Sequence, residues 1–69
     1  MYKWKLDIIL KNGKEIMVYY EGNENNSTDV ANKVLVGNEN YFNGFGNKNG
    51  TANVFVKLGD MSVVSISAA

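Results

Sequence analysis

Cysteine, histidine, proline and arginine are all absent from this sequence. A chain without cysteine forms no disulfide and offers no thiolate to a metal. A chain without histidine lacks the commonest metal ligand and general base. Arginine recognises phosphate and guanine as a two-pronged donor, whereas lysine replaces it only as a point charge. The sequence therefore predicts no metal site, no cofactor and no strong preference for nucleic acid.

Charge and motif spacing narrow the possible functions further. Seven lysines balance seven carboxylates, so no net field draws the chain to nucleic acid or to an anionic membrane. The carboxylates lack the spacing of a calcium loop, and no base accompanies the serines near the end of the sequence. We therefore expect no enzyme activity. No run approaches the ~18 apolar residues of a membrane helix, and a predicted strand follows Met1 directly, so we expect a cytoplasmic protein with no membrane contact.

The 69 residues are expected to form a single small β-rich domain. At this size one core only just offsets the entropy lost on folding, which is roughly 1.5 kcal/mol per residue. Because disulfides are excluded, burial between subunits is the remaining source of stability. The sequence therefore predicts a homo-oligomer.

The strongest local pattern is a pair of alternating apolar runs on either side of Asn12-Gly13. A two-residue loop would place the apolar residues of the two strands on opposite faces. A three-residue loop, Lys11-Asn12-Gly13, closed by a left-handed glycine and a bulge, makes one face wholly apolar. We predict this second register, which pairs Ile8 with Ile16, Leu6 with Val18 and Trp4 with Tyr20 toward the core, and Lys3 with Glu21, Lys5 with Tyr19 and Asp7 with Met17 on the outer face.

A short helix is predicted near residues 27–36. Its apolar residues recur at helical spacing, Asn26 or Ser27 is suited to cap its start, and Gly37 is suited to its end. The alternative is that residues 34–36 form a buried strand, because β-branched residues weaken a short helix. The apolar positions of the helix are Val30, Ala31, Val34 and Leu35.

The remaining sequence predicts a second hairpin and a last strand. We expect strands at residues 41–45 and 51–58 around a five-residue loop, with Phe45 opposite Thr51 and Phe42 beside Val54. A single 3₁₀ turn within residues 58–62 would precede a strand at residues 63–68. That turn would direct four residues inward: Leu58, Met61, Val64 and Ile66.

The element order is therefore strand, strand, helix, strand, strand, strand, and the fold class is α+β, mainly β. Five antiparallel strands with a 3₁₀-like turn before the last one resemble an SH3-like or Sm-like partly open barrel. The other architecture is an open, curved sheet with the helix packed across one face. The abundance of asparagine, lysine, tyrosine and isoleucine is similar to that of small uncharacterised proteins of phages and prophages of low-GC Gram-positive bacteria. This resemblance implies an accessory protein that acts by binding, with a host factor as its partner.

Aromatic and sulfur-containing side chains on the outer face are the candidate binding site. Such residues are enriched in protein interfaces, so we predict an interaction module that binds itself or a host protein. A nucleotide-binding or nucleic-acid-binding small barrel is one alternative, in which Lys48, Asn47 and Lys57 would contact the ligand together with exposed aromatic rings. A structural subunit of a particle is the other. The predicted partner-binding residues are Met17, Tyr19, Tyr41 and Phe55, with Lys3 and Lys5 at the rim.

Overall fold

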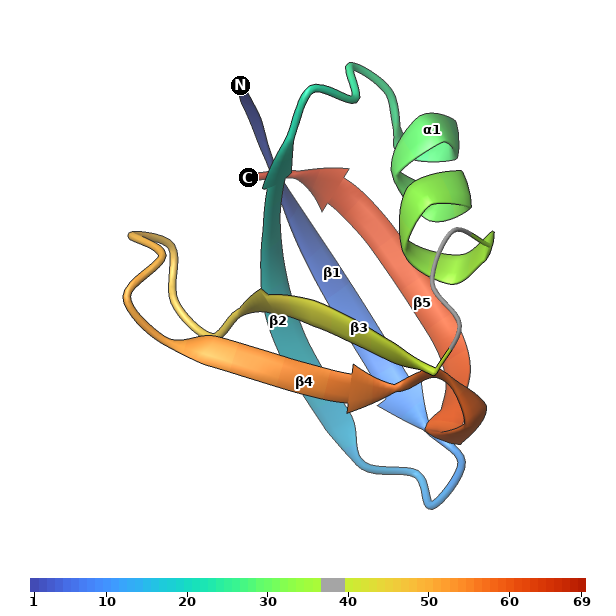
Figure 1. Ribbon diagram of the computed structural model, residues 1–69. Coiled ribbons are helices and arrows are strands. Elements are labelled where there is room, and N and C mark those ends of the chain that lie inside the picture. The colour runs from blue at the N-terminus through green and yellow to red at the C-terminus, as the bar shows by residue number, and fades with distance from the viewer. Residues whose placement is uncertain (37–39) are drawn as a thin grey trace.

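The structure, a computed structural model, describes residues 1–36 and 40–69. In these residues five antiparallel strands form one sheet in the order β4-β3-β2-β1-β5, with one short helix beside it (Figure 1). The predicted class and element order are confirmed, and the sheet is open and curved, not closed into a barrel. The elements are β1 (Tyr2–Leu10), β2 (Glu15–Gly22), α1 (Ser27–Ala31), η1 (Asn32–Val36), β3 (Tyr41–Phe45), β4 (Asn53–Lys57), η2 (Leu58–Asp60) and β5 (Met61–Ala68).

The first hairpin has the predicted bulged register. Ile8 lies opposite Ile16, Leu6 opposite Val18 and Trp4 opposite Tyr20. Gly13 has a φ of 87°, and its N–H donates to the Leu10 carbonyl at 2.9 Å. The Leu10 N–H donates in turn to the Lys14 carbonyl at 2.8 Å, which closes the three-residue loop. A positive φ is accessible to glycine at little cost, so this residue allows the turn that sorts apolar from polar side chains.

The core lies between the inner face of the sheet and the helix. Leu6, Val18, Val30 and Val34 are each 0% exposed. Strand alternation directs the even-numbered residues of β1 and β2 to this face, and burying them provides the main driving force for folding. The buried residues are Trp4, Leu6, Ile8, Val18, Val30, Val34, Phe42 and Val56, with Leu10, Ile16, Tyr20, Val54, Leu58, Met61, Val64 and Ile66 packed against them.

Residues 27–36 are helical throughout, so the alternative strand at residues 34–36 is wrong. Asn26 caps α1, since its Oδ1 accepts the N–H of Asp29 at 2.9 Å. From Asn32 onward the helix continues as the π-helical η1. The change from i→i+4 to i→i+5 hydrogen bonds alters the spacing of side chains, and Leu35, predicted on the apolar face, is 40% exposed. The predicted helix end at Gly37 lies outside the described residues.

The second hairpin exists, but its predicted register is wrong by two residues. Phe45 pairs with Asn53 instead of Thr51, and Phe42 pairs with Val56 instead of Val54. The loop is longer because Asn47 holds Thr51 within it: the Thr51 N–H donates to Asn47 Oδ1 at 2.9 Å, and Asn47 Nδ2 donates to Thr51 Oγ1 at 2.7 Å. A shift of two residues preserves the alternation of faces, so Phe42 remains in the core.

The predicted 3₁₀ turn is confirmed as η2, between β4 and β5. The Asp60 carbonyl accepts the N–H of Lys11 at 2.8 Å, which connects this turn to the loop of the first hairpin. β5 then runs antiparallel to β1, with Ile66 opposite Leu6 and Val64 opposite Ile8. The second hairpin crosses over the first (Figure 1), and β2 and β3 share a single register pair, Tyr19 with Phe45.

One polar cluster closes the end of the core near the start of the helix. Trp4 Nε1 donates to the Glu24 carbonyl at 3.1 Å, and the Tyr20 hydroxyl donates to Glu24 Oε1 at 2.5 Å. Gly22 lies beneath this cluster, and a Cβ on it would lie 2.6 Å from the Tyr20 hydroxyl oxygen. Glycine at this position therefore leaves the space in which Tyr20 and Glu24 meet.

We expect this cluster to make the free energy of unfolding decrease at alkaline pH. Burial, followed by the hydrogen bond to Glu24 and the charge of Glu24, raises the pKa of Tyr20 from 10.0 to about 12. The unfolded chain loses the phenol proton first, so the contribution of Tyr20 is complete below pH 10 and is lost as pH rises toward about 12. Urea unfolding of the wild type and of Tyr20→Phe, compared across this range, should give a free-energy difference that shrinks as pH rises. A difference that stays constant would contradict this assignment.

Candidate functional site

The side of the sheet away from the core, called here the outer face, is built by the odd-numbered residues of three neighbouring strands. Register pairs place them in rows, for example Val63 beside Ile9 and Ile9 beside Glu15. Because strand side chains alternate, these residues cannot share the core side with Leu6 and Ile8. The outer-face residues are Lys3, Lys5, Asp7 and Ile9 in β1, Glu15, Met17, Tyr19 and Glu21 in β2, and Val63, Ser65 and Ser67 in β5.

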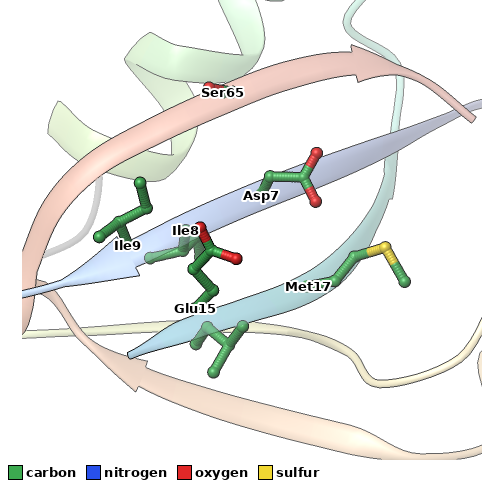
Figure 2. A pocket seen from close by; sticks show the side chains of 7 residues that line it. Asp7, Ile8, Ile9, Glu15, Met17 and Ser65 are labelled. Carbon is green, nitrogen blue, oxygen red and sulfur yellow. The ribbon is translucent and has the colours of Figure 1, made fainter. Parts of the chain in front are cut away.

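A shallow depression of about 420 Å³, called here the outer hollow, lies in this face. Figure 2 shows Asp7 on β1 and Glu15 and Met17 on β2, which project from adjacent strands around it. Met17 is 47% exposed and Ile9 is 36% exposed, so the hollow presents apolar surface to solvent. Its lining residues are Asp7, Ile8, Ile9, Glu15, Ile16, Met17 and Ser65.

The charges around the outer hollow are unbalanced. Within residues 1–36 and 40–69, neither Asp7 nor Glu15 takes part in an ion pair. The ion pair of this face joins Lys3 to Glu21 at 3.9 Å, and Lys3 Nζ also lies 3.4 Å from the Lys48 carbonyl oxygen. The outer hollow therefore combines exposed apolar side chains with two carboxylates that form no ion pair with any described residue.

Three of the predicted partner-binding residues lie close to one another on β1 and β2. The Tyr19 hydroxyl contacts the Met17 sulfur at 4.0 Å, and Lys5 lies opposite Tyr19. Lys5 and Tyr19 are both half-buried. Met17 lines the outer hollow, whereas Lys3 is held by Glu21 and the loop of the second hairpin.

Tyr41 and Phe55 form a separate group. They are 58% and 67% exposed and line a second depression of about 240 Å³, whose other residues include Leu10 and Ile16. Neither residue lines the outer hollow. The six predicted partner-binding residues therefore belong to two groups, because the second hairpin crosses over the first (Figure 1) and does not extend its outer face.

The residues of the alternative nucleotide site are also separated. Asn47 is engaged in the loop through Thr51, as described above, and Lys48 is exposed at the tip of that loop. Lys57 lies at the opposite end of β4, where it pairs with Tyr41. The four residue-to-residue steps of extended strand from Asn53 to Lys57 span roughly 13 Å, so the two lysines do not converge on one phosphate.

Sequence reasoning missed Ile9 and Val63 as parts of the exposed apolar surface. They lie opposite each other in the β1–β5 pair, and Val63 is 50% exposed. Strand alternation alone places Val63 on the face opposite Val64. The pairing of β5 with β1 is what brings it beside Ile9 and the outer hollow.

No cluster of three or more candidate metal ligands occurs in the described part of the chain. No helix formed by residues 1–36 and 40–69 has both the length and the apolar character needed to cross a membrane. Comparison with protein-family models, with curated proteins and with solved structures finds no match for this chain.

Proposed function

We propose that this chain is a non-enzymatic protein-binding module whose outer hollow receives an apolar side chain and an adjacent basic side chain of a partner protein. The observation that carries the proposal is the position of Asp7 and Glu15, which form no ion pair within the described part of the chain, around exposed Met17 and Ile9. The exposed apolar side chains, called here the apolar half, and the two carboxylates, called here the acidic half, each determine a different property of the partner.

The apolar half favours protein over solvent. Met17 is flexible and polarisable, so it adapts to partner side chains of irregular shape. Ile9 and Val63 extend the apolar surface beside it, and both are at least one-third exposed. Covering such side chains stabilises a complex by about 25 cal/mol per Å² of apolar surface removed from water. A few central residues usually dominate the binding energy.

The acidic half favours a basic partner. A lysine or arginine beside the hollow would neutralise Asp7 and Glu15, and this attraction would speed encounter at low salt. The same carboxylates disfavour a nucleic-acid ligand at this site, because phosphates would be repelled and no lysine lines the hollow. The chemistry of the outer hollow therefore supports a protein partner.

Affinity capture with three variants tests the proposal. Met17→Glu should abolish capture, because it removes apolar contact and places a charge in the interface. Asp7→Asn combined with Glu15→Gln should weaken binding of the captured partner roughly tenfold and reduce its dependence on salt. Phe55→Ser is the matched control: it removes a larger exposed apolar side chain outside the outer hollow, and should leave binding unchanged.

Captured proteins are identified by quantitative mass spectrometry, and their affinities are then measured with purified components. A partner that loses affinity with Phe55→Ser and not with Met17→Glu would refute the outer hollow as the binding site. A partner whose affinity is unaffected by neutralising both carboxylates would refute the basic character assigned to it.

A further inference from the structure

Among the residues that the structure describes, the strand β5 ends the sheet and has one hydrogen-bonded neighbour, β1. The Ala69 N–H donates to the Lys3 carbonyl at 3.1 Å, so the odd-numbered residues of this region direct their backbone groups toward β1. In an antiparallel ladder these directions alternate along the strand. The N–H and C=O groups of Val64, Ile66 and Ala68 therefore point away from β1, and we call this row the β5 edge.

The two outermost strands differ in how they are protected from pairing. β4 has five residues and ends in Lys57, a charged residue of the kind that protects edge strands. β5 has eight residues, Met-Ser-Val-Val-Ser-Ile-Ser-Ala, with no charge, no glycine and no proline. A long edge strand without such features is a template for a further strand. The β5 edge is therefore suited to pairing.

The sequence around Ile66 is symmetric in chemical character. Reading outward from Ile66, each serine is matched by a serine and each apolar residue by an apolar one: Ser65 by Ser67, Val64 by Ala68, and Val63 by Ala69. An antiparallel pair of two identical strands brings these matched residues opposite each other. Because Ile66 directs its backbone groups to the open edge, a two-fold axis at Ile66 gives a hydrogen-bonded pair.

We propose that two copies of this chain associate through their β5 edges, antiparallel and around a two-fold axis at Ile66, so that one sheet runs through both copies. On the inner side, Ile66 meets its counterpart and Val64 meets Ala68, while on the outer side Ser65 meets Ser67 and can exchange hydrogen bonds. Pairing with a second copy is favoured over pairing with a different polypeptide. Because β5 has no charged side chain and is symmetric about Ile66, no like charges face each other when two copies of it pair.

The surroundings of β5 are consistent with this arrangement. The helix lies beside β5 (Figure 1), and its residues Val30 and Val34 belong to the core on the inner side of the sheet. Ser65 and Ser67 are exposed on the outer side. Ser65 also lines the outer hollow, so Ser67 of the second copy would lie at its border. The inference is independent of the proposed function, because it concerns the edge of the sheet and not the ligand of the hollow.

Three charge variants at Ser65 and Ser67 test the pairing. Ser65→Lys with Ser67→Lys, and Ser65→Glu with Ser67→Glu, each oppose like charges twice across the axis. Both should weaken dimerisation at least about tenfold, and an equimolar mixture of the two variants should associate again. Ser65→Lys with Ser67→Glu opposes unlike charges and should dimerise at least as tightly as the wild type. Sedimentation equilibrium gives the dissociation constants.

Circular dichroism verifies that each variant is folded, and amide hydrogen exchange gives a second measurement. Val64, Ile66 and Ala68 should exchange slowly in the dimer and lose this protection on dilution. A wild type that stays monomeric up to ~1 mM, a concentration at which even weak pairs associate, would overturn the proposal and leave the edge to a different polypeptide. Equal dissociation constants for the like-charged and unlike-charged variants would also overturn it.

Discussion

Replacing Leu6 with alanine is expected to remove about half of the free energy that keeps this chain folded. Leu6 is 0% exposed in the central strand pair, between Val18 on β2 and Ile66 on β5. Truncation of a fully buried leucine costs about 2–5 kcal/mol, because transfer energy is lost and a cavity remains. A domain of 69 residues has a total stability of only roughly 3–10 kcal/mol. The substitution therefore removes about half of the free energy of unfolding.

Urea denaturation followed by circular dichroism measures this effect. The protein concentration is kept constant, because any association would add to the apparent stability. Ile9→Ala is the matched control: it truncates an aliphatic residue of similar size on the same strand, but on the outer face, where Ile9 is 36% exposed. A loss for Ile9→Ala that equals the loss for Leu6→Ala would mean that the two faces of β1 have been interchanged.

The second large effect is expected at Gly44, in the middle of β3. A Cβ at this position would lie 2.8 Å from the Tyr19 carbonyl oxygen and would collide with the Val18 side chain. Neither neighbour is free to move, because Val18 is fully buried and Tyr19 forms the register pair that joins β2 to β3. Overpacking of this kind typically costs about 1–3 kcal/mol. Gly44→Ala should therefore lower stability by about that amount and loosen the second hairpin.

Thermal unfolding and amide exchange measure the two consequences of Gly44→Ala. Gly59→Ala serves as the control, since a Cβ on Gly59 meets nothing within 4 Å. This control should be neutral or slightly stabilising, because alanine reduces the entropy of the unfolded chain. If both variants have the same stability, the close approach of β3 to β2 is not a constraint on the fold.

The first hairpin was predictable because local rules alone decide its register. Alternation from Trp4 to Tyr20 admits two registers, and only the bulged loop at Gly13 makes one face of the hairpin wholly apolar. The structure confirms this register in every predicted pair. The 3₁₀ turn at η2 and the inward residues of β5 follow from local spacing in the same way.

The second hairpin shows where local rules are insufficient. Loop length there depends on the hydrogen bonds between Asn47 and Thr51, and many polar residues in that loop could have made equivalent ones. A register error of two residues leaves each side chain on the same face of the sheet, so the burial of Phe42 was predicted correctly. In the helix, the change to π-helical hydrogen bonding after Ala31 has no comparable sequence signal, and it leaves Leu35 exposed.

Local pattern was enough to sort side chains between the two faces of the first hairpin, since alternation and a glycine turn act within one stretch of chain. Strand order, the position of Ile9 beside Val63, the crowding at Gly22 and Gly44, and the separation of Tyr41 and Phe55 from Met17 all required the folded molecule. The physical reason is that each depends on contacts between segments distant in sequence, and those contacts are selected by packing of the whole core and not by any one segment.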